Sequence, residues 1–187
     1  MEKYLLISNA YPTLDNLYSN SFLHRRVKAY QDKGLKVDVV VLTTRVIKDK
    51  FYDGVHIKYM DEYQIASYLK QNVYQTVMMH FVNPKMFHGI DALSKEERPN
   101  IVVWLHGFEA EAWHRRYYNF LENISQLDSA LERKDSVFEP QREFLKELMT
   151  RDDLNIKFVY VSKRFKELYV DPYVGVVPEK FTIIHNI

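Results

Sequence analysis

The stretch NIVVWLHGFEA, residues Asn100 to Ala110, decides the fold. Its first half is an unbroken run of apolar, β-branched and aromatic residues, which is typical of a strand covered on both faces. The run stops abruptly at His106 and Gly107, and the chain then becomes acidic. Strands covered on both faces belong to parallel sheets with helices on either side. We therefore expect His106 at the carboxyl end of a buried parallel strand.

Apolar runs of the same kind recur along the chain, with helical patterns between them. One such pattern, residues 20–34, has Phe22, Val27 and Tyr30 at roughly helical spacing and ends at Gly34, which suits a helix C-terminus. Alternation of strands and helices predicts an open, doubly wound and mostly parallel α/β sheet flanked by helices. The predicted strands are Tyr4–Ile7, Val37–Leu42, Val55–Tyr59, Thr76–Met79, Ile101–Leu105, Lys157–Val161 and Phe181–Ile184.

Residues 111–155 form a long charged insertion between two of the predicted strands. Apolar residues recur there at helical spacing and predict two or three amphipathic helices. The residues concerned are Phe120, Leu121, Ile124, Leu127 and Leu131, followed after Pro140 by Phe144, Leu145, Leu148 and Met149. Two interpretations stay open. The stripes pack on the sheet or on each other, or they contact a membrane, with Trp113, Tyr117 and Tyr118 at its interface.

Composition narrows the class of protein. The chain has 187 residues, 47% of them hydrophobic, which is enough for one domain with a sizeable core. Its 26 basic and 25 acidic residues give a net charge of +1, so no overall field favours nucleic acid. Cysteine is absent, which excludes thiolate metal sites and fits a reducing compartment. No run approaches the ~20 apolar residues of a membrane helix. We expect a soluble, cytoplasmic protein.

Polar residues follow several predicted strands. Because the carboxyl ends of parallel strands lie along one edge, where open α/β folds bind ligands, we expect these residues to line one crevice. They are Asn9, His80, His106, Ser162, His185 and Asn186. Each histidine taken alone also fits a hydrogen-bonded loop residue, and Ser162 also fits the N-cap of a following helix. The chain has no HExxH pattern and no GxSxG pattern, so we expect no metal site and no serine nucleophile.

The segment after the first strand is a long polar loop without a phosphate-binding motif. GxGxxG and the Walker pattern are both absent and the chain has only five glycines, which disfavours an ordinary dinucleotide-binding domain. The loop leads into a helix that begins near Ser21, with Arg25 and Arg26 one turn on. A helix N-terminus beside two arginines can bind an anion. The alternative is a solvated loop, with Asn20 or Ser21 as a simple cap and two surface arginines.

The order of these segments resembles the N-terminal half of the group-1 glycosyltransferases. The stretch from Gly34 to Leu42 and the closing PEKFTIIHN, residues 178–186, are its most characteristic parts. These enzymes use nucleotide sugars and have two Rossmann-like domains in the GT-B arrangement. The resemblance implies that residues 1–187 are the N-terminal, acceptor-side Rossmann-like domain. It also implies that a donor-binding domain lies outside this chain.

The resemblance also implies roles for individual residues. His106 resembles the catalytic histidine near the transferred sugar. The acceptor or a phosphate is expected to contact Ser19, Asn20, Phe22, Arg25, Arg26, Gly107 and Glu109. This chain has Ser19 and Asn20 where many members of the family have glycine.

The implied activity is transfer of a hexosyl group, with retention, from a nucleotide sugar to a saccharide or lipid-linked acceptor. Such transfer serves cell-surface or capsular polysaccharide synthesis, and the isolated chain is expected to be inactive. No cofactor, metal or nucleic acid is implied, and peripheral contact with the inner face of a membrane is compatible with the insertion. Two alternatives stay open: a non-catalytic ligand-binding or interaction module, and a sugar-nucleotide epimerase of the GT-B type.

Overall fold

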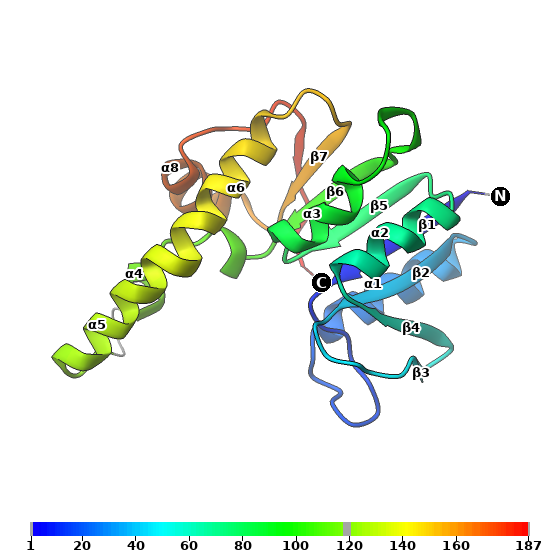
Figure 1. Cartoon of the computed structure of the whole chain (residues 1–187), viewed down its shortest axis with the longest axis horizontal. Helices are drawn as coiled ribbons and strands as arrows, with labels where there is room; N and C mark the ends of the chain where they lie inside the picture. The colour runs from blue at the N-terminus through cyan, green and yellow to red at the C-terminus, as the bar shows by residue number, and fades with distance from the viewer. Residues whose placement is uncertain (1, 118–120, 187) are drawn as a thin grey trace.

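One sheet of eight strands runs through the molecule, with helices on both faces (Figure 1). The computed structural model describes residues 2–117 and 121–186. The strand order is β3-β4-β2-β1-β5-β6-β7-β8. All neighbours pair in parallel except β3, which is antiparallel to β4. The predicted Rossmann-like, mostly parallel α/β fold is therefore confirmed.

The predicted strands all form, within about two residues of their expected ends. One strand, β3, was not predicted. It is a three-residue edge strand joined to β4 through Asp53 and Gly54, both at positive φ (44° and 76°), as a tight two-residue hairpin requires. The strands are β1 (Lys3–Ser8), β2 (Lys36–Leu42), β3 (Lys50–Tyr52), β4 (Val55–Met60), β5 (Thr76–His80), β6 (Asn100–Leu105), β7 (Ile156–Tyr160) and β8 (Phe181–Ile183).

Helices connect the parallel strands, as the alternating pattern predicted. The α-helices are α1 (Ser21–Asp32), α2 (Glu62–Gln71), α3 (Pro84–Asp91), α4 (Trp113–Tyr117), α5 (Ile124–Arg133), α6 (Glu139–Thr150), α7 (Lys163–Phe165) and α8 (Asp171–Val174). Short 3₁₀ turns are η1 (Lys95–Glu97) and η2 (Phe108–Ala110), and π turns are η3 (Lys134–Phe138) and η4 (Lys166–Val170). Gly34 follows α1 at φ 78°, as expected for a residue just beyond a helix end.

The two faces of the sheet are covered differently. The face under α2, α3 and α6 holds the larger apolar core, to which Phe87, Leu145 and Phe158 contribute fully buried side chains. On the opposite face α1 covers β1 and β2 through Leu23 and Val27. Beside α1 the sheet face from β5 to β8 is an open apolar groove of about 340 Å³.

The order in which strands are added to the sheet reverses at β1. The chain leaves β1 for β2 on one side and later returns to β5 on the other side. Connections on the two sides diverge at such a point, and a crevice opens outside the carboxyl ends of the strands. The fold thus places the candidate residues after β1, β5 and β6 around this crevice.

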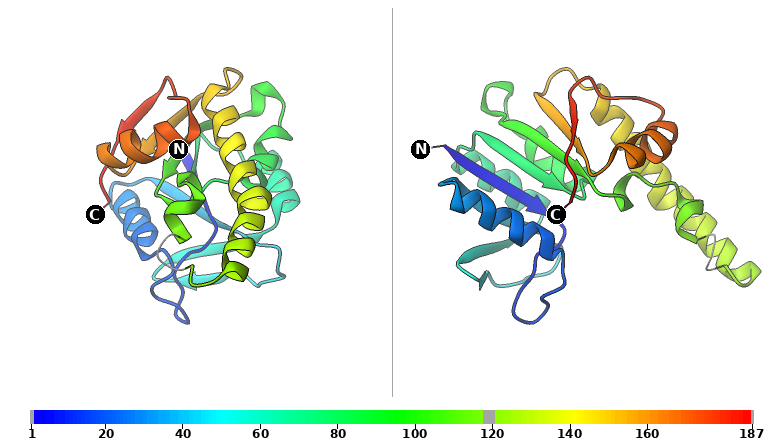
Figure 2. Two further views of the ribbon diagram at one scale, coloured as in Figure 1. Left: turned by 90° about the vertical axis from the view of Figure 1, so that its left-hand side faces the viewer. Right: turned by 180° about the vertical axis from the view of Figure 1, so that it is seen from behind.

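The predicted insertion forms a helical arm. Segments α5, η3 and α6 run on as one rod, which projects beyond the body of the molecule (Figures 1 and 2). The π turn η3 ends two residues before Pro140, which has no N–H to donate to the preceding turn. Leu145, Leu148 and Met149 pack on the core, as one of the two interpretations predicted.

The outer half of the arm does not pack on the sheet. Its apolar residues Ile124, Leu127 and Leu131 are exposed. Phe120 and Tyr118 lie outside the described residues. Within the described ranges, no helix combines the length and apolar character needed to span a bilayer.

A partly buried hydrogen-bond network holds the loop after β1 in place. Tyr11 Oη lies 3.0 Å from His24 Nδ1, and His24 Nε2 lies 3.1 Å from Asp53 Oδ2. The network joins the polar loop, the middle of α1 and the β3–β4 turn. We call these three residues the α1 anchor. It fixes α1 relative to the sheet without any glycine in the loop.

Candidate functional site

Five flat side chains form an aromatic stack at the carboxyl edge of β5 and β6. His80 ends β5 and pairs with Trp104 of β6, and their ring centroids lie 5.4 Å apart. His106 lies 5.2 Å from His80, centroid to centroid. The Phe81 and Phe22 rings lie 4.7 and 4.9 Å from His106. The stack therefore joins the ends of two neighbouring strands to the start of α1.

The two histidines of the stack form a neutral pair. His80 Nδ1 lies 2.9 Å from His106 Nε2, so one imidazole N–H donates to the bare nitrogen of the other. Burial lowers the pKa of both rings, that of His106 to about 4, and the charge of Arg26 acts in the same direction. Among the described residues no partner meets the buried Nε2 of His80 or Nδ1 of His106. Each ring thus keeps one unused polar nitrogen.

Arg26 lies over the other end of the stack. Its guanidinium carbon is 3.7 Å from the centroid of the Trp104 ring. Phe22 and Arg26 are one turn apart on α1, so both face the sheet. In the part of the chain that the structure describes, Arg26 makes no ion pair, and its buried Nε has no hydrogen-bond partner. Arg25, on the next face of the helix, is exposed.

The first turn of α1 opens toward this stack without a side-chain cap. Asn20 has a left-handed backbone (φ 53°) and no capping hydrogen bond. Its Nδ2 donates instead to Asn9 Oδ1 at 3.2 Å. Of the first N–H groups, that of Leu23 donates to the Asn20 carbonyl at 2.9 Å. The interpretation of Asn20 as a simple cap is therefore wrong, and among the described residues no acceptor meets the N–H groups of Ser21 and Phe22.

A buried carboxyl group lies on the other side of His106. Gly107, at φ 151°, reverses the chain so that Glu109 Oε1 accepts a hydrogen bond from the His106 N–H at 2.6 Å. Glu109 is 4% exposed, and burial raises the pKa of its carboxyl to about 7. Its Oε2 has no partner among the described residues. Glu109, Asn9 and Phe81 line a small cavity of about 180 Å³.

Other predicted site residues do not join this cluster. Ser162 Oγ accepts from the Phe165 N–H at 3.0 Å, so it is the N-cap of α7. His185 Nδ1 lies 3.1 Å from the Val161 carbonyl oxygen, and His185 and Asn186 are both exposed. Ser19 is half-buried in the loop. Within the described ranges, no group of three histidine or acidic residues could hold a metal ion.

Two members of the stack were missed by the sequence analysis. Trp104 lies two residues before His106, and side chains two residues apart along a strand point to the same face of the sheet. That spacing was a usable signal. Phe81 has a left-handed backbone (φ 57°), and no sequence pattern predicts this conformation. A bulky residue in this region is a marked outlier, and such strain concentrates at functional sites.

Replacement of Phe81 should expose this strain. Alanine keeps the left-handed backbone but loses the ring, whereas glycine also relieves about 1 kcal/mol of backbone strain. We expect Phe81→Gly to be more stable than Phe81→Ala by about that amount, measured by urea unfolding. The usual order in regular structure is the reverse. An alanine variant as stable as the glycine variant would contradict the strain.

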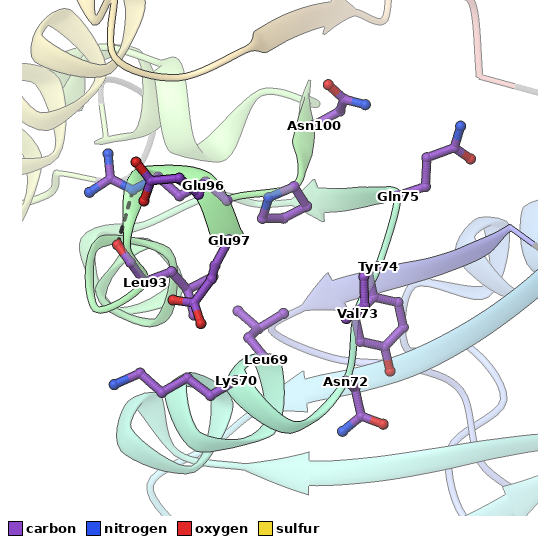
Figure 3. Close-up of a pocket in the computed structure, with 12 residues that line it drawn as sticks. Leu69, Lys70, Asn72, Val73, Tyr74, Gln75, Leu93, Glu96, Glu97 and Asn100 are labelled. Carbon is purple, nitrogen blue, oxygen red and sulfur yellow. Dashed lines mark hydrogen bonds between the residues drawn. The ribbon is translucent and has the colours of Figure 1, made fainter.

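A second hollow lies at the opposite, amino edge of the sheet (Figure 3). It has a volume of about 380 Å³ and is lined by the segment Val73 to Gln75 and by Glu96 and Glu97. Glu97 accepts the backbone N–H of Ser94 at 3.1 Å, as part of a capping box. Since its polar groups serve local turns and it lies away from the crevice, we do not assign it a ligand.

No family model matches this chain, and no curated protein matches it. Solved structures with a similar arrangement include two of a short-chain dehydrogenase/reductase from Veillonella parvula DSM 2008, one in complex with NADP and one ethylated. Both are 15% identical, with 86% of this chain and 69% of theirs covered. The TM-scores are 0.42 and 0.41. NADP is the ligand of that protein.

These comparisons contradict the predicted membership of the group-1 glycosyltransferases. No model of that family matches, and the solved structures named above are dehydrogenases/reductases. The predicted hexosyl transfer and the place in capsular polysaccharide synthesis are corrected with it. The same holds for the nucleotide-sugar donor and for the saccharide or lipid-linked acceptor. The catalytic role that the resemblance gave to His106 stays a prediction.

Proposed function

We propose that the chain is a ligand-binding domain whose carboxyl-edge crevice takes a small phosphorylated molecule. The observation that carries the proposal is Arg26, a guanidinium stacked 3.7 Å over Trp104 without a counter-charge in the described part of the chain. A partly desolvated cation without a partner is costly. An anionic ligand group supplies the missing charge.

The surroundings of Arg26 also favour an anion. The first turn of α1 has no side-chain cap, and free N–H groups at a helix N-terminus bind phosphate oxygens. His80 and His106 are neutral, and after their mutual hydrogen bond one ring N–H of the pair is left to donate without adding a charge that must be buried. A planar guanidinium binds two phosphate oxygens at once, which makes it stronger here than a lysine.

The remainder of the ligand has room next to these groups. Phe22, Phe81 and His106 are half-buried, so a flat or apolar part of the ligand can lie against their rings. Beyond His106, the cavity lined by Glu109 and Asn9 can take a hydrogen-bonding group. The crevice therefore suits a small organic phosphate better than free inorganic phosphate.

Recognition in this crevice differs from that of a glycine-rich dinucleotide site. The loop from Asn9 to Asn20 contains no glycine, so backbone N–H groups along it cannot approach a pyrophosphate closely. The charge must be recognised by a side chain, and Arg26 is the cation that the fold places there.

Titration of the full chain with inorganic phosphate and pyrophosphate tests the proposal. By calorimetry at pH 7 we expect saturable 1:1 binding of pyrophosphate, with a Kd between about 10 µM and 1 mM. In ¹⁵N spectra the amide signals of Ser21 and Phe22 and the Trp104 indole signal should shift. Absence of saturable heat, or shifts confined to surface lysines, would overturn the proposal.

Three sequence predictions stay predictions. The cytoplasmic location rests on the lack of cysteine, and peripheral membrane contact rests on the composition of the insertion. The second domain rests on the family resemblance. No described residue bears on any of them.

A further inference from the structure

We propose that two copies of this chain exchange their helical arms. In this assembly α5 of one copy lies in the open groove beside α1 of its partner, and the partner's α5 does the same in return. The proposal does not rest on the proposed phosphate site, although the groove shares Trp104 with the aromatic stack. It rests on two apolar surfaces of the same chain that no described residue covers and that carry opposite charges.

The first surface is the apolar stripe of α5, formed by Ile124, Leu127 and Leu131. The spacing of three and four residues puts all of them on one face of the helix. They are 78%, 39% and 39% exposed, and Ala130 is the one buried residue of α5. The arm projects away from the sheet, so the body of the same copy does not cover this stripe (Figure 2).

The second surface is the groove beside α1. It has a volume of about 340 Å³ and follows the sheet face across β5, β6, β7 and β8. Its walls are mainly apolar, with contributions from Tyr30, Met78, Val102, Trp104, Val159 and Ile184. An amphipathic helix binds such a groove through apolar residues three and four positions apart. The stripe of α5 has this spacing.

Charges at the margins of the two surfaces are opposite. Asp128 and Glu132 follow Leu127 and Leu131 directly, so both lie beside the stripe, and both are exposed. Lys157 lines the groove between β6 and β8, and it is exposed. Attraction between these carboxylates and Lys157 favours α5 as the occupant of the groove.

A two-fold axis completes the assembly. Each copy carries both surfaces, so one rotation pairs each arm with the other copy's groove and leaves no arm free. Exchange through two equal contacts limits the assembly to a dimer.

Sedimentation of three proteins tests the exchange. The arm variant carries Leu127→Glu and Leu131→Glu, the groove variant carries Lys157→Glu and Ile184→Glu, and Leu14→Glu in the polar loop is the control. Leu14 is 79% exposed, so its replacement touches neither surface. At up to about 100 µM the wild type and the control should sediment at twice the chain mass of 22.4 kDa. Each of the two variants should sediment at the mass of one chain.

Mixing the two variants gives the sharpest result. The intact arm of the groove variant can enter the intact groove of the arm variant, so the mixture should recover dimers although neither variant forms them alone. Circular dichroism confirms that each variant is folded, and Lys157→Glu alone serves if the double groove variant is not. A monomeric wild type, a groove variant that still dimerises, or a mixture that stays monomeric would overturn the proposal.

Discussion

Replacing Arg26 by alanine is expected to weaken pyrophosphate binding about 100-fold, or about 2.7 kcal/mol. The guanidinium is the one cation that the aromatic stack holds against the crevice, through its contact with Trp104. Loss of a charge-assisted, bidentate contact typically removes this much affinity. The measurement is calorimetric titration of the folded variant.

Arg25 provides the matched control, because it precedes Arg26 on the same helix and is exposed. Arg25→Ala should change the affinity less than about threefold, as screened surface charges do. Arg26→Lys keeps the charge but loses the planar fork, so its affinity should fall between wild type and Arg26→Ala. Equal losses for the two alanine variants would show a diffuse surface charge instead of a site.

Between pH 4.5 and 7.5 the wild type is expected to lose about 3 kcal/mol of unfolding free energy relative to Glu109→Gln. Burial raises the pKa of this carboxyl from 4.5 to about 7 in the folded protein. Between these two values the unfolded chain loses the proton while the folded chain keeps it. The unfolded state is therefore favoured increasingly as pH rises, until the folded group also ionises.

The direction in which stability changes with pH follows from this difference in proton binding between the folded and unfolded states. Relative to Glu109→Gln, the wild type should be most stable below pH 4.5 and should lose stability as pH rises toward 7. Urea unfolding of both proteins across this range measures the difference, and the titration of His80 and His106 largely cancels because both proteins keep them. Glu147→Gln, at an exposed position of α6, should parallel the wild type. A pH-independent difference for Glu109→Gln would contradict a raised pKa.

The central strands were predictable because each is buried on both faces and so reads as a continuous apolar run. The edge strand β3 escaped this rule, since its Phe51 is exposed and its three residues show no pattern. The Asp53–Gly54 pair was the available signal, as this dipeptide is typical of two-residue hairpins. The residues of the turn therefore indicated the hairpin, whereas the composition of β3 did not indicate a strand.

Part of the site followed from the same reasoning. Residues that directly follow parallel strands meet at one edge, which predicted that His80 and His106 would lie close together. The choice between Arg25 and Arg26 could not be made, because it depends on the rotation of α1 about its axis. The left-handed backbones of Asn20 and Phe81 are set by tertiary contacts and not by local sequence.

The family resemblance failed for a physical reason. It rested on the order and spacing of strands and helices, and that order is common to many Rossmann-like domains with unrelated chemistry. Order and spacing determine the sheet. They do not determine the rotation of a helix about its axis or which group an arginine contacts, and ligand recognition depends on both.

The α1 anchor has a consequence for the speed of binding. Tyr11, His24 and Asp53 hold the loop and the first turn of α1 in their final positions before any ligand arrives. A glycine-rich loop must be ordered by its ligand, and that ordering reduces affinity and slows association. Here the entropy of the loop has already been lost during folding. For the proposed phosphate ligand we therefore expect little ordering of the loop on association, so that affinities differ mainly in the rate of dissociation.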